Sequence, residues 1–189
     1  MKIAVAGKMR SGKDTLAKYF IENANTIQLA FGDEIKEIVS ICFPNEVAKG
    51  KPRKLYQQVG QFFREIYPNV WVDILEDKLD SISFYGHQDF IVTDVRQANE
   101  YRLLKSRGFT FIKVEADDEV RRKRIAKAGD VVSEEDFHHE TETAVDSLPF
   151  DYLIENNGTL EDFMAAIKSV HEEMERVDAT WINMNRPTN

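Results

Sequence analysis

A glycine-containing loop between a predicted strand and a predicted helix constrains the fold of this chain more than any other feature. Residues 2–6 (KIAVA) form a short apolar run, and residues 13–24 place apolar side chains on one helical face. Between them, the sequence GKMRSGKDT has the spacing G-x-x-x-x-G-K. In this strand–loop–helix context the spacing is typical of a phosphate-binding loop. Glycines let backbone N–H groups approach phosphate oxygens, and the helix N-terminus adds a positive dipole.

The loop also carries the polar side chains that phosphate chemistry requires. Lys13 is predicted to reach the β- and γ-phosphates of a bound nucleotide. Asp14 stands where the simplest pattern has Ser or Thr, and Thr15 follows it. Asp14 either helps to hold Mg²⁺ while Thr15 bonds a phosphate, or it only stabilises the helix N-terminus. The predicted ATP-binding residues of the loop are Gly7, Arg10, Ser11, Gly12, Lys13, Asp14 and Thr15.

Short apolar runs alternate with amphipathic segments along the rest of the chain. Strands are predicted at residues 2–6, 26–31, 89–94, 109–115 and 151–155, and helices at 13–24, 33–42, 53–67, 71–84, 98–107, 119–128 and 160–177. Pro44 is expected to end the second of these helices. Such alternation favours an α/β fold, with a parallel sheet covered by helices on both faces. A length of 189 residues without a linker-like segment indicates a single domain.

Charge is distributed unevenly along the chain. Lys and Arg total 25 against 33 Asp and Glu, which gives a net charge of −8. Residues 1–129 hold 22 basic and 18 acidic side chains, whereas residues 130–178 hold 2 and 15. The acidic balance argues against a protein that coats nucleic acid or an anionic membrane. The basic clusters at 49–54, 102–107 and 121–127 are either solvated surface or local sites of phosphate neutralisation.

The cysteine content and the hydropathy of the chain favour a cytoplasmic protein. Cys42 is the only cysteine, which excludes an intramolecular disulfide and a thiolate zinc site. No apolar run approaches the ~20 residues of a membrane span. The N-terminal residues lack the long apolar stretch of a signal peptide. We expect no metal at His138 and His139, because adjacent residues do not share a helical face and no third ligand is evident.

Charged side chains at the ends of the second and third strands predict a site for a second anionic molecule. Asp33 and Lys36 follow the second strand, at the edge where open α/β sheets bind ligands. The alternatives are a helix N-cap for Asp33 and a solvated side chain for Lys36. Asp94 ends the third strand, where a carboxylate for Mg²⁺ is expected. Arg96 is predicted to face the transferring phosphoryl group or the acceptor, and an ion pair with Glu100 is the alternative.

The segment 53–71 is the candidate for binding the acceptor. Arg53 and Arg64 are predicted to hold its phosphate, because guanidinium groups bind phosphate bidentately. Gln57 (or the neighbouring Gln58) is a candidate for hydrogen bonding to a base. Gly60 costs a helix interior roughly 1 kcal/mol relative to alanine, which indicates close approach of a ligand or of another helix.

Two aromatic side chains of the same segment have two interpretations. Trp71 and Phe63 either pack against a base or fill the core. The predicted acceptor-binding residues are therefore Asp33, Lys36, Arg53, Gln57, Arg64, Trp71, Asp94 and Arg96.

Five segments together resemble a known family. GKMRSGKDT, AFGDEIKE, the block from Arg53 to Trp71, IVTDVRQANE and DYLIENNGTLEDF occur in this order, between residue 1 and about residue 165. In combination they resemble the deoxynucleoside monophosphate kinases of bacteriophages and prophages, which are similar to adenylate kinase and other P-loop mononucleotide kinases. The resemblance implies a three-layer P-loop kinase fold with strand order 2-3-1-4-5. It also implies transfer of the γ-phosphoryl group of ATP to a deoxynucleoside monophosphate, with Mg²⁺.

The resemblance also implies roles for particular segments. It places an acceptor-binding helical insertion at about 33–84 and a short lid at about 121–145. Arg121 and Arg124 would lie near the lid and act on ATP, so the predicted catalytic set is Lys13, Arg96, Arg121 and Arg124. Asn157 and Gly158 would lie along the adenine, and a helix N-cap at Thr159 is compatible with that role. The segment His138–Glu142 belongs to the resemblance without an assigned role.

Other functions remain as alternatives at this point. Dephospho-coenzyme A kinase and phosphomevalonate kinase use the same loop, and a P-loop switch or motor ATPase subunit would lack a phosphoryl acceptor. The arginines of the segment 53–64 favour a kinase, because a switch needs no second anionic pocket. The expected partners are small molecules rather than nucleic acid or membrane, and the protein is expected to be a monomer or a homodimer.

Overall fold

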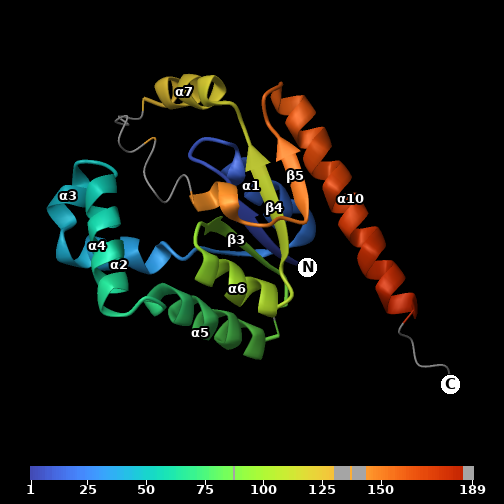
Figure 1. Ribbon diagram of the computed structural model, residues 1–189, viewed down its shortest axis with the longest axis horizontal. Helices are drawn as coiled ribbons and strands as arrows, with labels where there is room; N and C mark the ends of the chain where they lie inside the picture. The colour runs from blue at the N-terminus through green and yellow to red at the C-terminus, as the bar shows by residue number, and fades with distance from the viewer. Residues whose placement is uncertain (87, 130–136, 138–143, 185–189) are drawn as a thin grey trace.

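A five-stranded parallel sheet between two layers of helices forms the centre of the molecule (Figure 1). This computed structural model describes residues 1–86, 88–129, 137 and 144–184. The strands are β1 (Lys2–Ala6), β2 (Ile27–Leu29), β3 (Phe90–Val95), β4 (Thr110–Glu115) and β5 (Tyr152–Glu155). Their order is β2-β3-β1-β4-β5, and every pair is parallel. The predicted fold class and strand order are confirmed.

The helices form a layer on each face of the sheet. The helices are α1 (Lys13–Ala24), α2 (Asp33–Cys42), α3 (Pro44–Ala48), α4 (Arg53–Ile66), α5 (Val70–Phe84), α6 (Ala98–Ser106), α7 (Asp118–Lys127) and α10 (Leu160–Met184), with a 3₁₀ turn η1 (Ala144–Ser147). Helices α1 and α10 pack with one sheet face, and α2, α5, α6 and η1 pack with the other. Figure 1 shows α7 near the end of β4, and α2, α3 and α4 together at one side of the sheet.

Residue alternation along the central strand divides the core in two. Ile3 and Val5 of β1 face the layer of α1 and α10, whereas Ala4 and Ala6 face the opposite layer. All four side chains are buried, because β1 lies between β3 and β4 and both its faces are covered. A strand buried on both faces has a continuous apolar sequence, and KIAVA has that pattern. The loop after β1 therefore begins in the middle of the sheet, between the carboxyl ends of β3 and β4.

Three elements differ from the sequence-based prediction. Strand β2 covers only Ile27–Leu29 of the predicted residues 26–31. Pro44 does follow the end of α2, but it also starts the short helix α3, because proline is well tolerated in the first turn of a helix. Helix α10 continues to Met184, beyond the predicted end at residue 177. Most of the predicted lid, and the segment His138–Glu142, lie outside the described residues. Within the described residues, no helix combines the length and the apolar character that a membrane span needs.

Candidate active site

The loop of residues 7–12 forms a cradle between β1 and α1. Gly12 precedes α1 with a φ of 118°, a conformation that side chains other than hydrogen rarely adopt. A Cβ at Gly7 would lie 2.8 Å from Ser11 Oγ and 2.5 Å from the Val114 carbonyl oxygen. Among the described residues, the buried Ser11 hydroxyl has no hydrogen-bond partner. A narrow loop with glycine at both ends and a buried hydroxyl without a partner fits a phosphate group.

Lys13 folds back over this cradle. Its Nζ donates to the carbonyl oxygens of Gly7, at 2.6 Å, and of Lys8, at 2.8 Å. Ammonium donors prefer anionic acceptors to neutral carbonyls, because two opposite full charges attract each other more strongly than a charge and a dipole do. The side chain is therefore placed at the mouth of the loop, within reach of any phosphate that binds there.

Arg121 is one of two arginines of α7 that contact the backbone of the loop. The Arg121 side chain is 1% exposed and lies with its guanidinium carbon 4.2 Å from the centre of the Phe137 ring. Its Nε donates to the Met9 carbonyl at 2.9 Å, and its Nη1 bonds Asp118 at 2.7 Å. Arg121 therefore supports the backbone of the loop. It was predicted to act on ATP, and in this structure its side chain contacts the loop carbonyl of Met9.

Arg124 and Asn156 brace the next two peptides of the loop. Arg124 Nη1 donates to the carbonyls of Arg10 and Ser11, at 3.3 and 3.4 Å, and its Nη2 donates to the backbone and side-chain oxygens of Asn156. Asn156 Nδ2 donates to the Ser11 carbonyl at 2.7 Å. Because the N–H of a trans peptide points away from its C=O, these bonds to the Arg10 and Ser11 carbonyls turn the amides of Ser11 and Gly12 toward the opposite side. Burial lowers the pKa of Arg124, although a guanidinium stays charged at neutral pH.

A cavity of about 370 Å³ opens beside the start of α1. It is lined by Arg10, Gly12, Lys13, Asp14, Thr15, Arg124, Asn156, Leu160 and Phe163. Its volume is in the range of small-molecule sites. Five of the seven predicted loop residues line it directly, while Gly7 and Ser11 form the cradle behind it.

The loop after β5 borders this cavity and begins α10. Asn157 accepts a hydrogen bond from the Asp117 amide at 2.8 Å, so its side chain ties the loop to the start of α7. The Thr159 hydroxyl accepts from the Asp162 amide, and the Asp162 carboxylate accepts from the Thr159 amide. This reciprocal pair confirms the predicted N-cap at Thr159.

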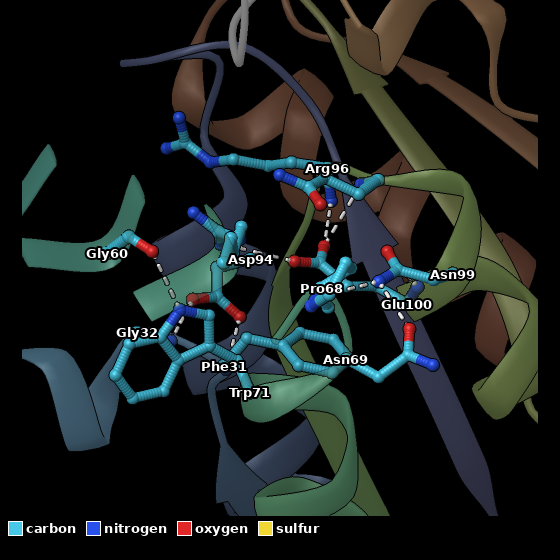
Figure 2. Close-up of polar contacts among 12 residues, drawn as sticks. Phe31, Gly32, Gly60, Pro68, Asn69, Trp71, Asp94, Arg96, Asn99 and Glu100 are labelled. Atoms are coloured by element: carbon cyan, nitrogen blue, oxygen red, sulfur yellow. Dashed lines mark hydrogen bonds and ion pairs between the residues drawn. The ribbon is translucent and has the colours of Figure 1, made fainter. Parts of the chain in front are cut away.

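Asp94 connects the end of β3 to the loop between β2 and α2. Its two oxygens accept the backbone N–H groups of Phe31 and Gly32, each at 2.8 Å (Figure 2). Burial raises the pKa of Asp94, and the two amides oppose that rise. Each oxygen of the predicted magnesium carboxylate thus already bonds a backbone amide. Nearby, the predicted Asp33 and Lys36 pair with each other at 2.7 Å on the exposed start of α2.

Helix α4 places the predicted acceptor arginines on the side toward the loop. Arg53 Nη1 lies 3.9 Å from Met9 Sδ, so α4 meets the phosphate loop at this point. About one turn later, Gln57 is half-buried on the same helix. Further along, Arg64 Nη2 lies 3.6 Å from Glu100 Oε1. Burial lowers the pKa of Arg64, as does the nearby charge of Arg96, whereas Glu100 and Asp94 raise it.

The structure places Trp71 in the core. It is 2% exposed, and its indole N–H donates to the Gly60 carbonyl at 3.1 Å (Figure 2). The ring of Phe63 packs against it edge-on. A Cβ at Gly60 would lie 2.9 Å from Ile35 Cδ1 of α2, so a neighbouring helix explains this glycine. Trp71 of α5 and Phe63 of α4 therefore pack together and belong to the core, which corresponds to the second of their two predicted interpretations.

A match to a known family completes this description of the site. The model of the AAA domain matches residues 3–144, which is most of the chain. The chain belongs to the AAA domain family. The matched region includes the phosphate loop, α4, the end of β3 and α7.

Two viral proteins are similar to this AAA-domain chain in sequence. It is 29% identical over 130 residues to the "Uncharacterized protein ORF76" of Ictalurid herpesvirus 1 (strain Auburn), over 67% of this chain and 50% of that one. The chain thus spans about half the length of that relative. It is 26% identical over 195 residues to the "Putative deoxynucleotide monophosphate kinase" of Acanthamoeba polyphaga mimivirus, over 88% of this chain and 94% of that one.

Solved kinase structures share the fold of this AAA-domain chain. An unliganded sugar kinase from Janibacter sp. HTCC2649 superposes with a TM-score of 0.60 at 16% identity, over 92% of this chain and 94% of that one. Dephospho-CoA kinase from Campylobacter jejuni gives a TM-score of 0.55 at 14% identity, over 94% and 100%. The AAA-domain chain therefore has the fold of the P-loop kinases.

Three polar residues of this AAA-domain chain contribute to the site without having been predicted to. Asn156 is 6% exposed and joins Arg124 to the phosphate loop. Asn99 donates to the carbonyl of Pro68 and the side chain of Asn69, which fixes the turn between α4 and α5 (Figure 2). Glu100 contacts the Arg64 side chain and two backbone amides, whereas the sequence suggested an ion pair with Arg96. Asn156 follows β5, and Asn99 and Glu100 follow β3, all at the carboxyl edge of the sheet. Their position at this edge was the sequence signal that could have identified them as site residues.

Proposed function

We propose that this protein is a kinase that transfers the γ-phosphoryl group of ATP to the phosphate of a deoxynucleoside monophosphate. One observation carries the proposal: the phosphate loop and a second group of arginines lie next to each other at the same sheet edge. Arg64 and Arg96 are close enough for the charge of one to lower the pKa of the other, and Arg53 reaches Met9 of the loop. Neighbouring cations beside a phosphate loop suit a second phosphorylated molecule.

The chain's residues divide between the two substrates. The cavity beside α1 would take the nucleoside of ATP, and the cradle of Gly7–Gly12 its phosphates. Lys13 would leave the carbonyls of Gly7 and Lys8 for the β- and γ-phosphates. Arg64 and Arg96, with Arg53, would hold the acceptor phosphate in line with the γ-phosphoryl group. Phosphoryl transfer needs this positioning and charge stabilisation more than it needs covalent help from the protein.

Magnesium fits the oxygen atoms at the start of α1. Asp14 and Thr15 both line the ATP cavity and offer a carboxylate and a hydroxyl, the hard ligands that Mg²⁺ prefers. When bound, Mg²⁺ neutralises charge on the phosphates. Asp94 is the weaker candidate, because both its oxygens already accept backbone amides. We therefore assign Mg²⁺ to Asp14 and Thr15 and assign Asp94 to the support of the acceptor site.

The substrate class can be tested directly with a panel of acceptors. Purified protein with ATP and Mg²⁺ is offered dGMP, dTMP, dCMP, dAMP, dephospho-coenzyme A and phosphomevalonate, and release of ADP is followed. We expect turnover with at least one deoxynucleotide. Turnover restricted to the last two compounds would remove the nucleotide assignment while leaving a kinase. ADP release that is independent of every acceptor would favour a nucleotide switch instead.

Arg64→Ala is expected to separate acceptor binding from ATP binding. Loss of a half-buried guanidinium at the proposed acceptor site should raise the acceptor KM by about tenfold or more, since charge-assisted bonds to phosphate are among the stronger ones. The KM for ATP should change less than twofold. Arg102→Ala is the matched control, because Arg102 is an exposed arginine of α6. An unchanged acceptor KM and kcat in Arg64→Ala would refute the assignment.

A further inference from the structure

The carboxyl group of Glu100 joins two segments that carry arginines of the proposed acceptor site. It lies in the first turn of α6, and the residue is 2% exposed. Its Oε1 faces Arg64 Nη2 of α4 at 3.6 Å. Its Oε2 accepts the amide of Arg96 at 2.7 Å and the amide of Gln97 at 3.0 Å (Figure 2). One carboxylate thus touches the side chain of one arginine and the backbone of another.

The position of Arg96 depends on this second contact. Arg96 is the first residue after β3, and Gln97 is the N-cap of α6. Helix starts leave backbone N–H groups without intrahelical partners. Glu100 satisfies the amides of Arg96 and Gln97, so it fixes the course of the backbone from which the Arg96 side chain extends. The Gln97 side chain completes the arrangement by accepting from the Glu100 amide.

Electrostatics oppose a carboxylate at this place. Burial and the negative charge of Asp94 raise the pKa of Glu100 to about 7, although both amides and Arg64 act in the opposite direction. The charged groups around it are Arg64 from α4 and Asp94 and Arg96 at the end of β3, with Lys36 of α2 facing Asp94. Burying a carboxylate costs free energy, which only ion pairing and hydrogen bonding offset. A neutral glutamine would fill the same volume without that cost.

We propose that Glu100 is a positioning residue for the acceptor, which holds the Arg64 side chain and the Arg96 backbone in place before the acceptor phosphate binds. The inference rests on the proposed kinase function. Arg64 has five N–H donors, and a single carboxylate oxygen at 3.6 Å occupies few of them. A phosphate can therefore bind the guanidinium without displacing Glu100. The two arginines are then preorganised, which reduces the ordering cost that the acceptor would otherwise meet.

The test is Glu100→Gln, with steady-state kinetics for both substrates at pH 8 and pH 6. Glutamine keeps the shape and can still accept an amide hydrogen, but it does not hold the Arg64 charge. At pH 8 we expect the acceptor KM to rise about five- to tenfold, with the KM for ATP within twofold of the wild type. At pH 6 wild-type Glu100 is largely protonated and resembles the glutamine variant. The acceptor KM of Glu100→Gln divided by that of the wild type should therefore fall below about threefold. Titration of the substrate phosphate affects both proteins alike and cancels in this ratio.

Two further variants make the test decisive. Glu76→Gln removes a carboxylate that pairs with Arg107 at 2.5 Å on the surface of α5, and it should leave both KM values unchanged. Glu100→Asp keeps the charge on a shorter side chain, and its acceptor KM should lie closer to the wild type than that of Glu100→Gln. A ratio that does not depend on pH, or equal changes in both KM values, would show that Glu100 only stabilises the fold. If the panel identifies a different acceptor, the proposed function fails, and the same measurements with that acceptor decide the role of Glu100.

Discussion

Lys13→Ala is expected to lower kcat by about two to three orders of magnitude without unfolding the protein. Removal of one preorganised cation or donor at a developing charge typically costs this much. In this structure, Lys13 Nζ donates to the backbone carbonyls of Gly7 and Lys8. Lys13 is a half-buried residue, so water can replace its ammonium group at those carbonyls. Turnover measures the loss of kcat, and thermal unfolding of the same preparation shows whether the fold is kept.

Lys18→Ala is the matched control for this variant. Lys18 lies on the same helix, its side chain is 73% exposed, and it faces Glu22 at 3.8 Å. Such an exposed pair contributes little to stability, so both turnover and unfolding temperature should stay near those of the wild type. If Lys13→Ala kept more than a tenth of wild-type kcat, Lys13 would not be the cation that stabilises the transferring phosphoryl group.

Local sequence signals predicted the fold and the phosphate loop, because the groups that interact there are close in sequence. The apolar run of residues 2–6 determines a central strand, and the spacing from Gly7 to Lys13 determines how the chain turns into α1. The N-cap at Thr159 is equally local, since its partner is Asp162. Pro44 shows the limit of such rules, because the same residue that ends one helix is suited to begin the next.

The directions of long polar side chains could not be predicted in the same way. Arg121 and Arg124 contact carbonyls of the loop more than 110 residues earlier, and a backbone carbonyl leaves no mark in the sequence. Glu100 contacts Arg64 of a different helix, whereas helical spacing pointed to Arg96. Trp71 had a base and the core as its alternatives, and only the packing of α2, α4 and α5 distinguishes them.

Gly12→Ala should both destabilise the protein and reduce its turnover. A Cβ at this position would lie 2.3 Å from Asn156 Nδ2 and 3.0 Å from the ring of Phe163. The φ of 118° adds backbone strain for any residue with a side chain. Asn156 has little freedom to move away, because it bonds the Ser11 carbonyl at 2.7 Å and Arg124 at 3.0 Å. We expect a loss of about 2–4 kcal/mol in the free energy of unfolding, measured by urea denaturation.

The cost of the close contacts can be separated from the cost of strain with Gly50→Ala. Gly50 has a φ of 137°, and a Cβ there would meet nothing within 4 Å. This variant therefore measures strain alone, about 1–2 kcal/mol, and its turnover should equal that of the wild type because Gly50 lies outside the proposed site. The difference between the two variants in the loss of unfolding free energy reports how tightly Asn156 and Phe163 hold the phosphate loop. Equal destabilisation, with turnover kept in Gly12→Ala, would mean that the loop shifts freely, and the support proposed for it by Asn156 and Arg124 would have to be abandoned.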